Sequence, residues 1–253
     1  MPRNASLEAT APRTAERAID FSKRAELTEL MDEPCGREDL RSCLRDLERL
    51  NRWFLGYRPV LRWLDSLDLR RAGRPLHVLD VGCGFGDGLR RIERWARQSG
   101  VEVELTGCDI NPDAAAIAAD ATPKTSQIEW IAADIFSYDS RKPIDIVISS
   151  LFTHHLKEDE IVRFLRWMEA TTHVGWFIND LSRAPAPYRL LKVFSRVAGL
   201  HPFVQHDGPV SIARAFVADD WRRMCAAADL HECDVTIESF TPARLCVGRK
   251  KKL

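Results

Sequence analysis

The chain has 253 residues, of which 45% are hydrophobic and 29% are charged, as expected for a soluble globular protein with a substantial core. Lys plus Arg and Asp plus Glu both number 37, and this balance argues against bulk electrostatic binding of nucleic acid. No apolar run approaches the ~20 residues of a membrane span. The seven cysteines are scattered and the first residues carry no signal peptide, which predicts a cytoplasmic protein with reduced thiols.

The N-terminal third precedes the first strand pattern. Residues 1–14 predict a flexible tail, and residues 15–75 a helical segment. Within that segment, residues 37–55 carry apolar side chains at helical spacing, and a second helical stretch follows Pro59.

Residues 76–253 are expected to form one domain. Apolar strand patterns alternate with helical patterns, which predicts an α/β fold with a doubly wound, mostly parallel, Rossmann-like sheet. Five strands are expected before the pattern breaks, at residues 77–82, 101–110, 128–134, 144–150 and 174–180.

Residues 181–217 interrupt the alternation after the fifth strand. They predict an inserted apolar helix at 188–200 and then a loop at 201–216. A helix is expected at 218–230. Two last strands are joined through Thr241-Pro242, a link too short for a crossover helix, so these two strands are expected to be antiparallel.

The stretch "VLDVGCGFGDG" at residues 78–88 predicts a loop that holds a nucleotide-containing cofactor. A phosphate loop needs Gly-Lys-Ser/Thr after its glycines, whereas Gly86 is followed by Asp87. A dinucleotide loop needs a small residue at the position of Asp87, and an acid there would repel the pyrophosphate.

S-adenosylmethionine fits the loop better, because it has no phosphate and carries an ammonium at its methionine end. Asp80 suits that ammonium, and bare glycines let the backbone approach the ligand closely. Asp109 ends the next strand and suits the two ribose hydroxyls, while Asp134-Ile135 suits the adenine.

Four stretches in order, "VLDVGCGFGDG", "GCDINPDA", "AADIFSYD" and "IDIVISSLFTHHL", resemble the motifs of class I S-adenosylmethionine-dependent methyltransferases. The resemblance covers residues ~76 to 250. It implies a seven-stranded sheet of order 3-2-1-4-5-7-6 with strand seven antiparallel. "THHL" and "FINDLSR" are similar to methyltransferases that modify small molecules of the quinone or polyketide type. The cofactor-binding residues expected are Asp80, Gly82, Cys83, Gly84, Gly86, Asp109, Ile110, Asp134, Ile135 and Ser150.

The residues that bind the methyl acceptor are expected after strands four and five, where open α/β sheets bind their ligands. His155 and His206 are the candidate general bases. Further acceptor contacts are expected from His154, Asn179, Tyr188 and Arg214. The apolar stripe at 187–200 is interpreted as a lid over the acceptor. No metal is expected, because strand four ends in Ser149-Ser150 where metal-dependent relatives carry an acid.

The sequence therefore predicts methyl transfer to a small apolar acceptor, with a phenol or enol oxygen favoured over carbon. The signature of enzymes that methylate nucleobase amino groups is absent, since "SSLF" stands in its place. Two alternatives stay open: an NAD-dependent oxidoreductase with an aberrant glycine loop, and a cofactor-binding domain without catalysis.

Overall fold

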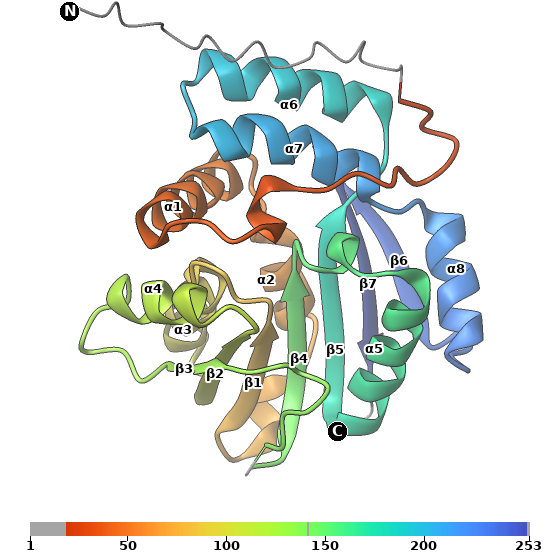
Figure 1. Ribbon diagram of the computed structural model, residues 1–253. Coiled ribbons are helices and arrows are strands. Elements are labelled where there is room, and N and C mark those ends of the chain that lie inside the picture. Colours follow the sequence, from red (N-terminus) through yellow and green to blue (C-terminus); the bar gives the residue numbers. More distant parts are fainter. Residues whose placement is uncertain (1–18, 141, 252–253) are drawn as a thin grey trace, which may run out of the picture.

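The computed structural model describes residues 19–140 and 142–251. Seven strands form one sheet in the order β3-β2-β1-β4-β5-β7-β6 (Figure 1). Strands β1 to β5 are parallel, and β7 runs antiparallel to both β5 and β6. The strand order and the antiparallel last strand confirm the prediction. The strands are β1 Leu76–Val81, β2 Val103–Asp109, β3 Glu129–Ala132, β4 Ile144–Ser150, β5 Thr172–Leu181, β6 Val235–Phe240 and β7 Arg244–Lys250.

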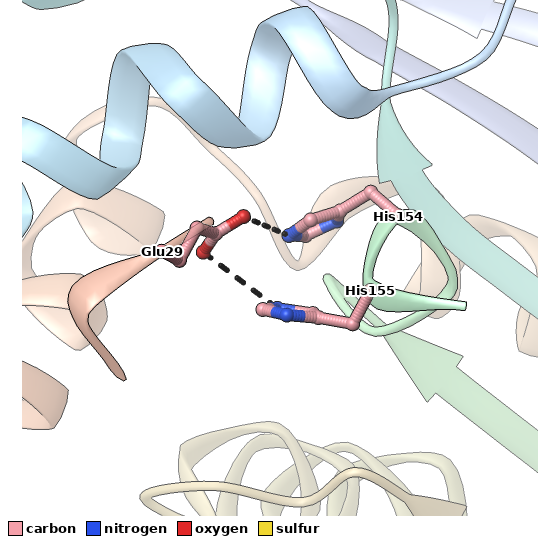
Figure 2. A group of neighbouring side chains, drawn as sticks. All are labelled: Glu29, His154 and His155. Carbon is pink, nitrogen blue, oxygen red and sulfur yellow. Dashed lines mark ion pairs between the residues drawn. The ribbon is translucent and has the colours of Figure 1, made fainter. Parts of the chain in front are cut away.

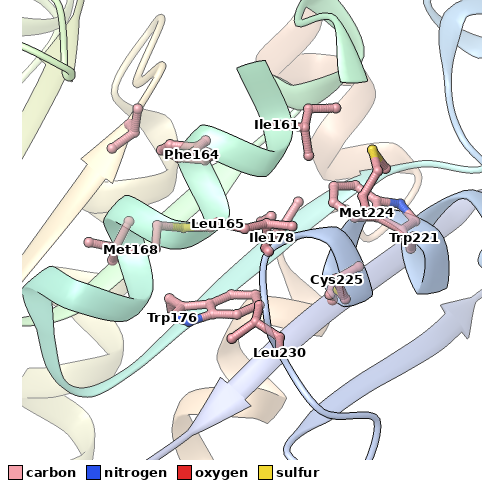
Figure 3. Close-up of a cluster of buried hydrophobic side chains, with 14 of the residues drawn as sticks. Ile161, Phe164, Leu165, Met168, Trp176, Ile178, Trp221, Met224, Cys225 and Leu230 are labelled. Atoms are coloured by element: carbon pink, nitrogen blue, oxygen red, sulfur yellow. The ribbon is translucent and has the colours of Figure 1, made fainter. Parts of the chain in front are cut away.

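Helices cover both faces of the sheet, because successive strand residues point to opposite sides. Leu79 packs with α5 (Glu158–Thr171) and α8 (Ala218–Ala227), in the cluster drawn in Figure 3. Its neighbour Val78 packs on the other face, with α2 (Arg58–Asp65) and α3 (Asp87–Ser99). The two cores explain why the strands read as nearly continuous apolar runs.

The remaining helices gather toward the carboxyl ends of the strands. Helices α6 and α7 pack as a pair above these ends, and α1 lies below α7 in Figure 1. This pair is the helical insertion predicted after the fifth strand. The remaining helices are α1 Arg37–Trp53, α4 Pro112–Asp120, α6 Pro185–Val197 and α7 Pro202–Arg214, and the short 3-10 helices are η1 Leu30–Asp32, η2 Leu69–Ala72 and η3 Thr153–His155.

The prediction of a loop at 201–216 is wrong, because α7 spans most of it. Gly208 and Pro209 suggested irregular backbone, and Pro209 does remove one hydrogen bond inside the helix. Every residue from 207 to 214 is nevertheless buried, so tertiary packing outweighs the low helix propensity of this stretch.

Within the described ranges, no helix has both the length and the apolar character needed to cross a membrane. All seven cysteines are free thiols. The predicted flexible tail at 1–14 lies outside the described residues.

Candidate active site

The glycine loop connects β1 to α3 at the carboxyl edge of the sheet. Gly82 and Gly86 both have φ near +70°, a backbone conformation that residues with a Cβ atom rarely adopt. A Cβ on Gly86 would lie 2.2 Å from the ring of Trp130, and one on Gly82 would lie 2.7 Å from Phe152. The loop therefore needs glycine both for its backbone and for the aromatic side chains packed against it.

Asp109 holds this loop to the end of β2. Its Oδ2 accepts the amide of Gly84 at 2.9 Å, and its Oδ1 accepts the amide of Asn111 at 2.9 Å. Burial raises the pKa of Asp109, and the two amides oppose that effect. Each carboxylate oxygen keeps a further lone pair, so the group can still accept hydroxyl donors from a ligand.

One cavity of about 1200 Å³ lies along the carboxyl ends of β1, β2 and β4. It brings together most of the residues predicted to bind cofactor, and both histidines that follow β4. The predicted residues on its wall are Gly82, Cys83, Gly84, Asp109, Ile110, Asp134, Ile135, Ser150, His154 and His155. A second group of wall residues is apolar and comes from α1, α6 and α7; it includes Leu47, Leu50, Phe54, Leu190, Leu191 and Val204.

Six predicted residues do not line this cavity. Gly86 is covered by Trp130, as described above. Asn179 lies at the end of β5, where its amide group donates to the carbonyl oxygen of Gly56. Tyr188 packs edge-on against Phe21. The other three are Asp80, His206 and Arg214.

His206 does not reach the cavity although it lies on α7. Its side chain is about half exposed, and its Nδ1 atom is 2.7 Å from the carboxylate of Asp207. Asp207 is the residue of this pair that lines the cavity. The base role predicted for His206 has no support in this geometry.

Two buried ionisable side chains near the Asp87 end of the cavity have hydrogen-bonding atoms without a partner among the described residues. Asp80 lies beneath the glycine loop, and its Oδ1 has no hydrogen-bond partner among the described residues. Arg244, at the start of β7, lines the cavity and donates to Asn51, while its Nη1 is equally unpartnered within the described ranges. Burial, with the charges of Asp87 and Asp109, raises the pKa of Asp80 well above its ordinary value. A ligand with an ammonium and a carboxylate would complement this end.

A cluster of Glu29, His154 and His155 forms the wall after β4 (Figure 2). The Nε2 atom of His154 lies 3.7 Å from Oε1 of Glu29, and that of His155 lies 3.8 Å from Oε2. Burial raises the pKa of Glu29 to about 7, although the charges of His155 and Arg214 oppose it.

Carboxylates hold the opposite side of both imidazole rings. The Nδ1 atom of His154 is 2.7 Å from Asp180, and that of His155 is 2.9 Å from Asp32. The His155 imidazole holds the pKa of Asp32 well below its ordinary value. With Nδ1–H donated to a carboxylate, each neutral ring presents the lone pair of Nε2 toward Glu29.

Sequence reasoning missed the contribution of the segment before α1. Glu29 and Asp32 come from this segment, which has no helical or strand periodicity. It is held in place by the amides of Leu30 and Met31, which donate to the carboxylate of Asp207 at 2.8 and 3.1 Å. No local pattern in the sequence could indicate a contact between residues that are 177 positions apart.

Residues 78–175 match the family model described as a methyltransferase domain. The match spans β1 to the start of β5, and the sheet has the order expected of class I methyltransferases. The matched segment and the strand order are thus similar to those of S-adenosylmethionine-dependent methyltransferases, and neither is the pattern expected of an NAD-dependent oxidoreductase.

Solved structures with the same fold support the domain's architecture. The plantazolicin methyltransferase BpumL, solved with SAH, is 14% identical, with a TM-score of 0.59 over 85% of this chain and 95% of that one. The magnesium protoporphyrin IX methyltransferase of Synechocystis, also solved with SAH, is 16% identical, with a TM-score of 0.51 over 78% of this chain and 81% of that one. No curated protein matches this chain in sequence.

Proposed function

We propose that this protein is an S-adenosylmethionine-dependent methyltransferase, which acts on a small, apolar, ring-containing acceptor and methylates a phenol or enol oxygen. The observation that carries the proposal is the single cavity of about 1200 Å³, which joins the glycine loop to the histidines after β4. Its wall is polar at the sheet edge and apolar where α1, α6 and α7 cover it. A cavity of this kind suits a flat apolar ligand whose orientation is fixed by a few polar groups.

The cofactor occupies the sheet-edge half of the cavity in this proposal. Asp109 accepts the ribose hydroxyls, and Asp134 with Ile135 contacts the adenine. The methionine end lies near Asp87 and Arg244, which are both on the cavity wall. The ammonium of that end approaches the buried carboxyl group of Asp80, and its carboxylate accepts a hydrogen bond from Nη1 of Arg244, which has no other partner within the described residues.

The acceptor lies between the end of β4 and the inserted helices. Ser150 and Phe152 line the cavity next to the glycine loop, which is where the methyl group would be presented. Leu191 lines the opposite side, and this placement supports the role of α6 as a cover that excludes water. The sulfonium is a strong electrophile, so the main task of the protein is to align the methyl group with the attacking oxygen.

An oxygen acceptor must also lose a proton. His155 is the predicted base that lies on the cavity wall, and 29% of its side chain is exposed. Its Nδ1 atom faces Asp32, so the neutral ring can accept a proton at Nε2. In the proposed reaction the oxygen–carbon bond forms as the carbon–sulfur bond breaks, and S-adenosylhomocysteine leaves as a neutral thioether.

Two measurements, made one after the other, test the proposal. Calorimetry should show that the protein binds S-adenosylhomocysteine but not NAD. Labelled S-adenosylmethionine should then transfer its methyl group to members of a panel of phenols and enolisable diketones, with mass spectrometry locating the new methyl on oxygen. Methylation at carbon or nitrogen alone would contradict the oxygen assignment. Cofactor binding without transfer to any compound from cell extracts would support a non-catalytic domain instead.

A further inference from the structure

We propose that Glu29, His154 and His155 bind one divalent transition-metal ion of the Zn²⁺ type on the cavity wall. The three residues come from the segment before α1 and from η3, and Figure 2 shows both imidazole rings directed at the carboxylate. The inference rests on the proposed function, because the same wall is assigned to the acceptor oxygen.

The distances within the cluster fit a shared ion better than direct hydrogen bonds. The two Nε2–oxygen separations, 3.7 and 3.8 Å, are too long for hydrogen bonds. The ligand atoms of the three residues nevertheless all lie within 4.8 Å of one another. Two ligands bound to one Zn²⁺ at roughly 2.0–2.1 Å, in tetrahedral geometry, are separated by about 3.3–3.4 Å. Small side-chain shifts would therefore complete the site.

One oxygen of the buried Glu29 carboxylate has no hydrogen bond within the described part of the chain. Glu29 is only 3% exposed, and its Oε1 atom has no hydrogen-bond partner among the described residues. Arg214 lies 3.4 Å from that oxygen, but its nearer partner is Asp32, at 2.7 Å. An unsatisfied buried carboxylate oxygen is costly, and coordination to a cation would compensate for it.

The surroundings of both histidines have the form found around metal-bound imidazoles. A metal-bound histidine usually donates its second ring N–H to a carboxylate or carbonyl, which fixes the ring and its tautomer. Asp180 does this for His154 and Asp32 does it for His155. Two independent carboxylate–histidine pairs thus present their Nε2 atoms toward the same glutamate.

Charge at the cluster also favours a cation. Three carboxyl groups, those of Glu29, Asp32 and Asp180, surround the two imidazoles. Arg214 pairs with the first two, and Arg24 reaches the carbonyl oxygen of His154. The carboxylates still outnumber the two guanidinium groups. The donor set of two nitrogens and one carboxylate suits Zn²⁺, Co²⁺ or Fe²⁺, whereas Mg²⁺ prefers oxygen ligands.

The metal would bind the acceptor oxygen from the cavity side. Coordination lowers the pKa of a bound hydroxyl, so the acceptor would release its proton to solvent and attack the methyl carbon as an oxyanion. The oxygen–carbon bond then forms while the carbon–sulfur bond breaks. In this form of the site, Nε2 of His155 is a metal ligand and does not accept the proton.

Titration of the untagged, chelator-treated protein with Co²⁺ tests the site, with the visible absorption of bound cobalt as the readout. We expect one equivalent to bind, Zn²⁺ to displace it, and Mg²⁺ to have no effect. Glu29→Gln and His155→Asn should each weaken Co²⁺ binding by at least tenfold. His206→Asn is the matched control, because His206 is a half-exposed histidine outside the cluster, and it should bind Co²⁺ like the unmodified chain.

Binding of S-adenosylhomocysteine by each variant shows whether it is folded, and it separates the two proposals. Saturable cobalt binding that both cluster variants retain would overturn the metal site, as would the absence of binding at one equivalent. Methyl transfer that is unaffected by chelation would overturn the catalytic use of the metal and leave the proposed function intact. Stoichiometric cobalt binding without methyl transfer to any acceptor would support the metal site and contradict the proposed function.

Discussion

The Nδ1 atom of His154 lies 2.7 Å from Oδ1 of Asp180, and both side chains are almost fully buried. Asp180 also accepts the hydroxyl of Thr153 at 2.5 Å and the amide of His154 at 3.0 Å. Burial alone would raise the pKa of Asp180, but the His154 imidazole and these donors hold it well below its ordinary value. Asp180 therefore stays ionised and fixes the direction of the His154 ring.

Asp180→Asn should disturb the ring of His154 while leaving cofactor binding intact. An amide can present its nitrogen to Nδ1 and favour the wrong tautomer. Carboxylates that orient a metal-binding histidine typically contribute 10–100-fold to metal affinity or activity. We therefore expect the rate of methyl transfer to fall by about that factor. Steady-state rates with an identified acceptor check this. Thr153→Val is the control, since it removes one bond to Asp180 without touching the imidazole; an equal loss there would indicate general loosening.

Arg244→Met should weaken binding of the cofactor. The substitution removes the buried guanidinium proposed to hold the cofactor's carboxylate, and a hydrogen bond to a charged group contributes about 1.5–3 kcal/mol. We expect the dissociation constant for S-adenosylhomocysteine to rise roughly 10–150-fold in calorimetry. Arg249→Met serves as the control because Arg249 lies on the same strand but pairs with Asp234. If both variants bind equally well, Arg244 does not contact the cofactor.

Cofactor affinity should rise with pH because of Asp80. Its raised pKa means that part of the cofactor-free protein carries a neutral Asp80 at pH values above the ordinary range of aspartate. The cofactor's ammonium favours the ionised form, so affinity increases as Asp80 loses its proton and falls toward acid. The contribution of Asp80 to the stability of the cofactor-free protein changes in the opposite direction. It is greatest below the pKa of Asp80 in the unfolded chain, and it is lost as the pH rises through the pKa of Asp80 in the folded protein.

Asp80→Asn isolates this effect, because asparagine has nearly the same size and no titrating group. Calorimetry over a pH series should show weaker binding and a loss of the pH dependence that Asp80 provides. A variant whose binding follows the same pH curve as the unmodified chain would show that another group is responsible.

Gly86→Ala should destabilise the protein more than Gly100→Ala. Both glycines have positive φ, +73° and +65°, so both substitutions carry a backbone penalty of about 1 kcal/mol. A Cβ on Gly100 meets nothing within 4 Å, whereas one on Gly86 would collide with Trp130. The difference between the two free energies of unfolding, from urea titration, measures that collision, and we expect about 1–3 kcal/mol. Equal values would mean that Trp130 moves aside freely.

The fold, and the gathering of the glycine loop, Asp109 and Asp134 along one cavity, could be predicted from the sequence because their signals are local. The glycine loop, Asp109 and Asp134 each follow an apolar strand, and parallel strands bring their carboxyl ends to one edge. The antiparallel last strand followed from the short link at Thr241-Pro242. Each of these inferences needs only a few consecutive residues.

The acceptor half could not be predicted in the same way. Glu29 reaches the cavity from a segment without a distinctive pattern, and its partner His154 lies more than a hundred positions away. The helix α7 was hidden by Gly208 and Pro209, whose local preferences are overridden by burial. The sequence therefore suggests His206 as a base in a polar loop, whereas its neighbour Asp207 is the residue that holds the segment before α1.

The amides of Leu30 and Met31 donate to Asp207 and so hold the segment before α1 against the wall of the cavity. Of the groups assigned to the acceptor wall, Glu29, Leu191 and Asp207 all lie outside residues 78–175, the range that matches the methyltransferase family. A fragment cut to that range would retain the glycine loop but lose the wall against which an acceptor is held. In the proposed function, the acceptor is therefore selected jointly by residues of the matched segment, such as His155, and by sequences on both sides of it.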